Sequence, residues 1–244
     1  MITLKNIVKS FEDKVVLQDV SSMFQPGLTN LIIGQSGSGK TVLMKCIVGL
    51  LTPEQGQVLY DDRNLVTMTK RERTLLRREM GMIFQSAALF DSMTVMQNVM
   101  FPLDMFSSES AHRRAERALY CLDRVGLSNA TQKFPGEISG GMQKRVAIAR
   151  AIALKPRFLF CDEPNSGLDP KTSAVIDELI SDLTHELGTT TIINTHDMNS
   201  VHTIGEHILF LRHGKNDWEG SMKDIEDTAS QALKEFINPQ MAHH

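Results

Sequence analysis

Residues 34–41 constrain this chain more than any other segment, because they match a phosphate-binding loop of the form G-x-x-x-x-G-K-[ST]. The eight residues are Gly34, Gln35, Ser36, Gly37, Ser38, Gly39, Lys40 and Thr41. The glycines let the backbone turn its N–H groups inward around a phosphate, at dihedral angles that side chains forbid. Lys40 can reach the β- and γ-phosphates, and the Thr41 hydroxyl can bind Mg²⁺. A chance match occurs in about one chain of this length in a hundred, so the segment predicts nucleotide binding.

The residues on either side of this loop have the pattern that such a loop requires. Residues 28–33 form a short apolar run typical of a buried strand, and residues 41–51 repeat apolar side chains at helical spacing. The dipole of that helix favours an anion at its N-terminus. Strand and helix patterns go on alternating further along the chain, which predicts an α/β fold with a mostly parallel sheet. The segments are helix 141–154, strand 157–161, helix 173–187, strand 189–194 and strand 208–211.

Two other regions differ from this alternating pattern. Residues 1–24 read as two strands joined by a polar turn, which predicts an N-terminal antiparallel β subdomain. Residues 86–138 are rich in methionine and charge, and they predict an inserted helical subdomain with its clearest helices at 95–103 and 111–125. We therefore expect one domain over residues 1–244, with a nucleotide-binding core (1–85 and 139–220), the helical subdomain (86–138) and a C-terminal tail of one or two helices (221–244).

Composition excludes several other classes of protein. The hydrophobic fraction of 41% and the charged fraction of 23% are ordinary for a globular protein, and a net charge of −3 gives no overall basic field for nucleic acid. Three separated cysteines without metal-ligand spacing fit a reducing cytosolic setting. The N-terminus lacks the apolar core of a signal peptide, and no run approaches the ~20 apolar residues of a membrane span. If the protein serves a membrane, we expect other chains to cross it.

A second chemical feature is an apolar strand that ends in two carboxylates, Asp162 and Glu163. A buried strand avoids such charge unless a cation lies nearby, so we expect Asp162 to support Mg²⁺, mainly through its water shell. Glu163 can polarise an attacking water molecule, and Pro164 favours a loop over a helix at that point. In isolation the strand could simply end in a polar loop. Beside a phosphate loop it predicts nucleotide hydrolysis.

Residues 138–145, Ile-Ser-Gly-Gly-Met-Gln-Lys-Arg, resemble the signature motif of the ABC (ATP-binding cassette) ATPases. Ser139, Gly140 and Gly141 at the start of a helix are a second anion site of the same physical kind as the first. The resemblance implies that they contact the γ-phosphate of an ATP held by a partner subunit, so that two chains enclose two ATP molecules. A plain N-cap and turn is the alternative interpretation.

The resemblance extends along nearly the whole chain and implies roles for further residues. Gln85 resembles the Q-loop residue that contacts Mg²⁺ and links to a membrane partner, and residues 165–169, ending in Asp169, resemble the D-loop. His196 resembles the switch histidine that contacts the γ-phosphate. Phe11 lies where the family stacks an aromatic ring on adenine. Both a lone histidine after a strand and a phenylalanine in a strand pair also have an ordinary structural interpretation.

Three longer sequence runs are similar to those of one branch of the family. The runs ISGGMQKRVAIARAIA, LFDSMTVMQNVMFPLD and DEPNSGLDP resemble the Mla-type (maintenance of lipid asymmetry) and Mce-associated phospholipid transport ATPases. The resemblance implies a P-loop NTPase core of ABC type, with ATP and Mg²⁺ as cofactors and Glu163, His196 and Gln85 as catalytic residues. Thr41, Gln85 and Asp162 are the residues implied for the metal.

The implied partners are a second copy of the chain, separate membrane-spanning permease subunits, and possible accessory regulator and substrate-binding proteins, with no nucleic acid. The implied location is peripheral, at the cytoplasmic face of the inner (plasma) membrane. Six methionines lie near the Q-loop strand: Met80, Met82, Met93, Met96, Met100 and Met105. They are either core residues or the lining of a groove that receives a permease helix.

Four alternative functions are distinguished by sequence features. The chain could serve a transporter of another solute. A soluble ABC ATPase acting on DNA or ribosomes would resemble tandem domains or carry long insertions, whereas this chain has one set of motifs. A GTPase would need the Asn-Lys-x-Asp motif, which is absent. An inactive regulatory ATP binder is disfavoured by the intact Glu163 and His196.

Overall fold

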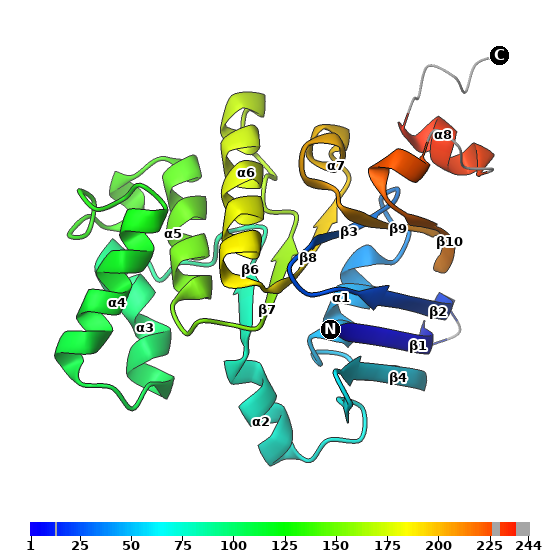
Figure 1. Cartoon of the computed structure of the whole chain (residues 1–244), viewed down its shortest axis with the longest axis horizontal. Coiled ribbons are helices and arrows are strands. Elements are labelled where there is room, and N and C mark those ends of the chain that lie inside the picture. The colour runs from blue at the N-terminus through cyan, green and yellow to red at the C-terminus, as the bar shows by residue number, and fades with distance from the viewer. Residues whose placement is uncertain (13, 226–229, 238–244) are drawn as a thin grey trace.

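The computed structural model describes residues 1–12, 14–225 and 230–237, and its strands form two sheets (Figure 1). An antiparallel sheet contains β1 (Ile2–Phe11), β2 (Lys14–Phe24), β4 (Gln55–Tyr60) and β5 (Arg63–Asn64), in the order β2-β1-β4-β5. A second sheet contains β3 (Thr29–Ile33), β6 (Met80–Ile83), β7 (Phe158–Asp162), β8 (Thr190–Thr195), β9 (His207–Arg212) and β10 (Lys215–Gly220). Its order is β10-β9-β3-β8-β7-β6, and every neighbouring pair is parallel except β10 with β9.

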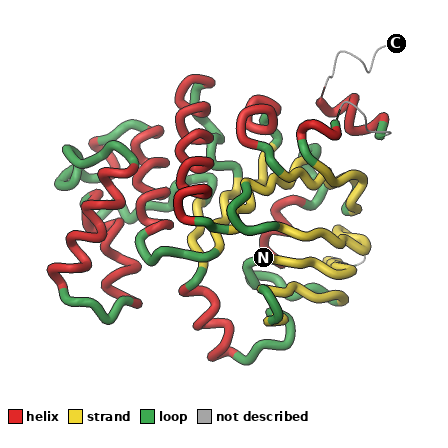
Figure 2. Tube along the Cα trace, in the orientation of Figure 1, coloured by secondary structure: helices red, strands yellow, loops and turns green. Residues whose placement is uncertain are grey.

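Helices surround the second sheet and form a block at one end of it. They are α1 (Lys40–Ile47), α2 (Lys70–Arg78), α3 (Val95–Phe106), α4 (Ala111–Arg124), α5 (Gly140–Ile152), α6 (Pro170–Leu187), α7 (Met198–Ile204) and α8 (Gln231–Ile237). Figure 2 shows α3, α4 and α5 gathered on the side of the molecule away from the antiparallel sheet. Short 3₁₀ turns lie at Pro135–Glu137 and Met222–Asp224.

The central sheet is buried on both faces, because alternate side chains of its strands enter different cores. Leu31 and Ile33 of β3 pack in the core that includes α3 to α7. Ile32, between them, packs in the core formed with α1 and the antiparallel sheet. This arrangement confirms the expected α/β class with an N-terminal antiparallel sheet. The mostly parallel sheet places the carboxyl ends of β3, β7 and β8 at one edge, where the sequence puts its polar motifs.

Several elements, among them α2, α7 and β10, were not expected from the sequence pattern. Helix α2 buries only Leu76 and, apart from the exposed Leu75, is basic and polar, although a capping box between Thr69 and Glu72 fixes its start. Helix α7 has seven residues, too few for a periodic signal. Strand β10 is polar and pairs with β9 through its backbone. Of the expected tail, residues 226–229 and 238–244 lie outside the described residues.

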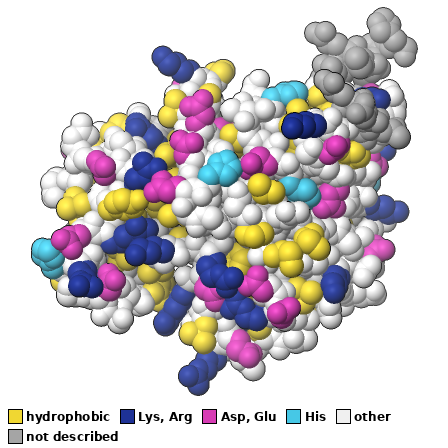
Figure 3. Space-filling view, viewed as in Figure 1, with side chains coloured by type: hydrophobic (Ala, Val, Ile, Leu, Met, Phe, Trp, Pro, Cys, Tyr) yellow, Lys and Arg dark blue, Asp and Glu magenta, His cyan; other side chains and the backbone are white. Residues whose placement is uncertain are grey.

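Charged side chains of both signs are interspersed on the face that Figure 3 shows, instead of gathering into the kind of basic surface that binds nucleic acid. Within the described part of the chain, no helix has both the length and the apolar content needed to cross a bilayer.

Candidate nucleotide-binding site

The phosphate loop joins β3 to α1 and depends on glycine at two positions. Gly34 has φ 150°, and a Cβ there would lie 2.2 Å from the carbonyl oxygen of Leu211. Gly39, the N-cap of α1, has φ 109°, and its Cβ would lie 2.9 Å from Leu17 Cδ2. A side chain at either position would therefore displace the strands behind the loop. The glycines keep the loop against the sheet and leave its open side for a ligand.

Lys40 lies folded over this loop. Its Nζ donates to the carbonyl oxygens of Gly34 at 2.7 Å and Gln35 at 3.1 Å, and the residue is 7% exposed. Burial lowers the pKa of the Lys40 ammonium, and the carboxylates of Glu163 and Asp162 oppose that shift. Ser38 Oγ is buried without a hydrogen-bond partner among the described residues. A cation held by backbone carbonyls and an unpaired hydroxyl are groups that phosphate oxygens can satisfy, so the loop fits a nucleotide phosphate chain.

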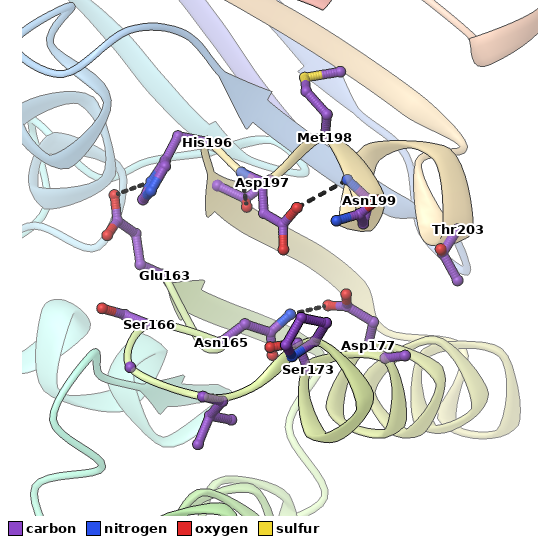
Figure 4. Close-up of a pocket in the computed structure, with 15 residues that line it drawn as sticks. Glu163, Asn165, Ser166, Ser173, Asp177, His196, Asp197, Met198, Asn199 and Thr203 are labelled. Carbon is purple, nitrogen blue, oxygen red and sulfur yellow. Dashed lines mark hydrogen bonds and ion pairs between the residues drawn. The ribbon is translucent and has the colours of Figure 1, made fainter.

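Two carboxylates lie at the end of β7, close enough to influence the Lys40 ammonium of this loop. Asp162 Oδ1 accepts a hydrogen bond from Asn194 Nδ2 at 2.9 Å. Glu163 Oε1 lies 3.1 Å from His196 Nδ1, and Figure 4 shows these two side chains pointing toward each other. Glu163 adopts φ 48°, a left-handed conformation that is uncommon for a residue with a Cβ and is often found where function requires it. The carboxylate of Asp162 and the hydroxyl of Thr41 are oxygen ligands of the type that Mg²⁺ prefers.

One cavity of 660 Å³ brings eight of the expected residues together. The predicted residues that line it are Gln35, Ser36, Gly37, Gly39, Lys40, Thr41, Glu163 and His196. Val16 and Phe236 also line it, and neither was expected from the sequence. The structure therefore places a cationic loop and a carboxylate–histidine pair around a single space.

Other predicted residues lie elsewhere in this chain. Phe11, at the end of β1, is 44% exposed, and the Lys9 ammonium lies 5.2 Å from its ring centroid. Ser139 Oγ accepts from Met142 N at 3.3 Å as the N-cap of α5, and Asp169 is the N-cap of α6. None of the three lines the 660 Å³ cavity.

Gln85 is held by groups outside the 660 Å³ cavity. Its Nε2 donates to Ser166 Oγ at 2.9 Å, and its carbonyl oxygen accepts from the Lys144 ammonium. The next turn contains Ala87 and Ala88 at φ 60° and 49°, and their carbonyl oxygens accept from the Arg150 guanidinium at 2.8 Å each. Lys144 and Arg150 both belong to α5, so the helix that begins with the signature motif also fixes the backbone around Gln85.

Gly141 is required where α5 packs against α6, and this gives a stability prediction. A Cβ on Gly141 would lie 2.7 Å from Thr172 Cγ2, whereas a Cβ on Gly140 would meet its nearest atom at 3.9 Å. We expect Gly141→Ala to lower the free energy of unfolding by about 1–3 kcal/mol through overpacking, measured by urea denaturation. Gly140→Ala is the matched control and should cause no loss.

Adding Thr172→Ser should restore most of the stability of Gly141→Ala. Serine removes the clashing methyl group but keeps the hydroxyl that donates to Asp169 Oδ2 at 2.6 Å. Equal stability of the two alanine variants would contradict the packing role of Gly141.

Sequence reasoning included Asn165 in the segment that resembles the D-loop but missed the two polar residues that it contacts. Asn165, Asp177 and Ser200 hydrogen-bond to one another, and the first two line a second cavity of 720 Å³ that also reaches Glu163 and His196 (Figure 4). The available signal was Asp177 itself, a charged residue at a core position of the helix predicted at 173–187.

Comparison with known proteins identifies the family. A family model described as ABC transporter matches residues 17–166. The probable ribonucleotide transport ATP-binding protein mkl of Mycobacterium leprae (strain TN) is 37% identical over 214 residues, which cover 87% of this chain and 62% of the relative. The chain thus spans less than two thirds of that relative. The methionine import ATP-binding protein MetN of Clostridioides difficile (strain 630) is 37% identical over 240 residues, covering 98% of this chain and 74% of MetN.

Solved structures agree with the sequence relatives. The dimeric bacterial ABC transporter cassette MJ0796 superposes with a TM-score of 0.82 at 34% identity, over 91% of this chain and 99% of that one. The same cassette in a dimeric post-hydrolysis state, bound to ADP and Pi, gives a TM-score of 0.81. The family model matches more than half of this chain, and two relatives are 37% identical to it. This chain therefore belongs to the ABC transporter family, whose cassettes bind ATP with Mg²⁺ and hydrolyse it.

Proposed function

We propose that this chain is the ATP-hydrolysing subunit of an ABC transporter that moves phospholipid between membranes, working with separate membrane-spanning subunits. The observation that carries the hydrolytic part is the single cavity in which the Lys40 loop faces the Glu163–His196 pair. The phospholipid part is supported by the resemblance of three sequence runs to the Mla-type and Mce-associated ATPases. Two of the runs contain Ser139 and Glu163, and the third begins four residues after Gln85.

The residues divide the chemistry among them as follows. ATP bound with Mg²⁺ supplies the γ-phosphoryl group that is transferred to water and the cation that neutralises its charge. The loop N–H groups and the Lys40 ammonium hold the phosphates, while Thr41 and Asp162 would supply oxygen ligands or hold water for the metal. Glu163 accepts a hydrogen bond from the attacking water, and His196 orients that carboxylate. No covalent intermediate with the protein is required.

We propose that a second copy of the chain completes each site. Ser139, Gly140 and Gly141 begin α5, where the free N–H groups of the first turn can receive a phosphate oxygen. They do not line the cavity of their own chain, so the phosphate that they receive belongs to the partner. Asp169, at the start of α6, is proposed to lie at the same dimer interface. The dimeric cassette MJ0796 supports this arrangement.

We propose that the permease docks beside the Q-loop strand. A cavity of 300 Å³ there is lined by residues of β6, the loop after it, α3 and α5. Phe84 and Phe90, which line it, are 39% and 41% exposed. Met80 and Met82 also line it and pack against one core, while Met96 and Met100, beyond it, pack against the other. An apolar surface beside the proposed catalytic loop suits a helix of a partner protein.

The experiment is purification of the tagged full chain from detergent-solubilised membranes, followed by mass spectrometry of proteins and small molecules. We expect a multi-span membrane protein together with bound phospholipid. Since mkl and MetN are named for ribonucleotide and methionine transport, those solutes are measured in the same samples. Recovery of either solute without lipid would overturn the cargo assignment, and recovery of nucleic acid without a membrane protein would overturn the transporter role.

A further inference from the structure

Three polar side chains form a closed set of hydrogen bonds next to the nucleotide cavity. Asn165 Nδ2 donates to Asp177 Oδ1 at 2.7 Å, and Ser200 Oγ donates to Asp177 Oδ2 at 2.7 Å. Asn165 Nδ2 also lies 3.3 Å from Ser200 Oγ. Figure 4 shows Asn165 and Asp177 facing each other on the same side of the pocket, with Glu163 and His196 near its other edge. Asp177 thus uses both of its carboxylate oxygens, one for each neighbouring segment.

The two donors come from the two segments that carry the hydrolytic residues. Asn165 lies in the loop that contains Glu163, after β7. Ser200 lies in α7, the helix that follows His196 after β8. Asp177 lies in α6 and belongs to neither segment. One carboxylate therefore joins both of the segments whose side chains meet at the 3.1 Å contact between Glu163 and His196.

The environment of Asp177 is unfavourable for a residue that only fills space. It is 3% exposed and Ser200 is 1% exposed. Burial raises the pKa of Asp177, the hydrogen bonds from Ser200 and Asn165 lower it, and the Asp197 carboxylate raises it. An apolar side chain could fill the same position of α6 without the desolvation that a carboxylate suffers.

The side-chain oxygen of Asn165 is left without a hydrogen bond from the described residues in this arrangement. Asn165 Oδ1 is buried with no hydrogen-bond partner in the described part of the chain, because the amide directs its NH₂ group at the carboxylate. A buried unpaired oxygen is unfavourable, and charge-assisted bonds are the stronger kind. The hydrogen bond to Asp177 therefore determines where the loop after Glu163 lies, although Asn165 keeps one unpaired oxygen as a result.

We propose that Asp177 is a positioning residue for ATP hydrolysis. It links the Glu163 loop to the helix after His196 and so fixes the relative position of the Glu163 and His196 side chains. Asp177 does not line the 660 Å³ cavity, so it acts through these segments and not on the nucleotide. The inference rests on the proposed roles of Glu163 and His196. According to this inference, one buried carboxylate links two segments that are far apart in the sequence.

The test compares two substitutions at the same position in the purified full chain, with ATP turnover and KM measured for each. Asp177→Leu removes both acceptors, and we expect kcat to fall about ten- to a hundredfold, the scale of a small misplacement of catalytic groups. KM for ATP should stay within about twofold, because the phosphate loop is untouched. In Asp177→Asn the amide oxygen accepts from Asn165 and its NH₂ group donates to Ser200, so kcat should remain within about threefold of the unsubstituted chain.

The matched control is Thr184→Val on the same helix. Thr184 is fully buried and its Oγ1 donates to Ile180 O at 2.7 Å, but it lies toward the far end of α6 from these loops. We expect it to lower Tm without lowering kcat. If Asp177→Leu lowers Tm and leaves kcat unchanged, or if Asp177→Asn is as slow as Asp177→Leu, the positioning role is wrong.

Two further variants keep the test decisive. Where Asp177→Leu fails to fold, Ser200→Ala removes one of the two ties, and we expect about a threefold loss of kcat at constant KM; full activity would overturn the inference. Glu163→Gln is measured in parallel. Normal turnover in that variant would overturn the proposed role of Glu163, whereas a slow Glu163→Gln with a normal Asp177→Leu would overturn only the inference about Asp177.

Discussion

Glu163→Gln is expected to reduce ATP turnover by about a hundred- to a thousandfold, the range seen when one group acting on the transition state is removed. An amide has nearly the shape of the carboxylate but cannot take a proton from water. Its oxygen can still face His196 Nδ1, which now lies 3.1 Å from Glu163 Oε1. Glutamine can adopt the φ of 48° that Glu163 has, so the loop should keep its place.

ATP affinity should stay close to that of the unsubstituted chain, because the Lys40 loop is intact. The bound ATP should then persist, and size-exclusion chromatography with light scattering should find a stable dimer in ATP and Mg²⁺. Glu178→Gln, at an exposed position of α6, is the matched control and should turn over normally. Unchanged turnover in Glu163→Gln would remove Glu163 from the mechanism, and a monomer under saturating ATP would contradict the shared site.

The parts of the fold and site that sequence could predict are those fixed by local chemistry. The phosphate loop is set by glycine conformations and by the apolar runs beside it, and both can be recognised without knowing the rest of the chain. Asp162 and Glu163 were predicted as nucleotide-site residues because charge at the end of a buried strand requires a cation nearby, which a nucleotide with Mg²⁺ would supply. His196 was predicted from its order along the chain in the family resemblance, and in the structure its Nδ1 lies 3.1 Å from Glu163 Oε1.

The parts that sequence could not predict depend on tertiary contacts. Strand β10 is polar and forms because β9 offers it a backbone edge, and α2 is stabilised by its capping box although it buries one residue. Asp177 has an ordinary sequence context, and its role appears only when Asn165 and Ser200 are brought to it from different loops. The division into core and helical subdomain stays a prediction. In the structure α5 contacts α3 and α4 on one side and β6 on the other.

Lys40→Ala is expected to weaken ATP binding by about a hundredfold, which corresponds to the loss of a charge-assisted contact with phosphate. The ammonium now donates to the carbonyl oxygens of Gly34 and Gln35, so a cation is already held where a phosphate would bind. Isothermal titration with ATP and Mg²⁺ measures the loss. Lys45→Ala, at an exposed position of the same helix, is the control and should bind normally.

The stability of the chain without nucleotide should change much less than ATP binding does. Burial lowers the pKa of Lys40 from 10.5, so the unfolded chain binds this proton more tightly than the folded one. The resulting destabilisation is present below the lowered pKa of the folded chain and fades as the pH rises through it toward the unfolded value. Lys40→Ala removes this destabilisation together with the two hydrogen bonds to Gly34 and Gln35, so without nucleotide it should melt close to the unsubstituted chain at pH 7.

The two effects separate clearly when ATP is added. ATP at a hundred times its Kd stabilises the unsubstituted chain by about 2.7 kcal/mol. The same ATP concentration equals the weakened Kd of Lys40→Ala and adds only about 0.4 kcal/mol. Thermal melts with and without ATP and Mg²⁺ thus distinguish a lost ligand contact from a damaged fold. A Lys40→Ala variant that melts lower without ATP but keeps the full ATP-induced shift would show that Lys40 supports the loop and does not hold the phosphates.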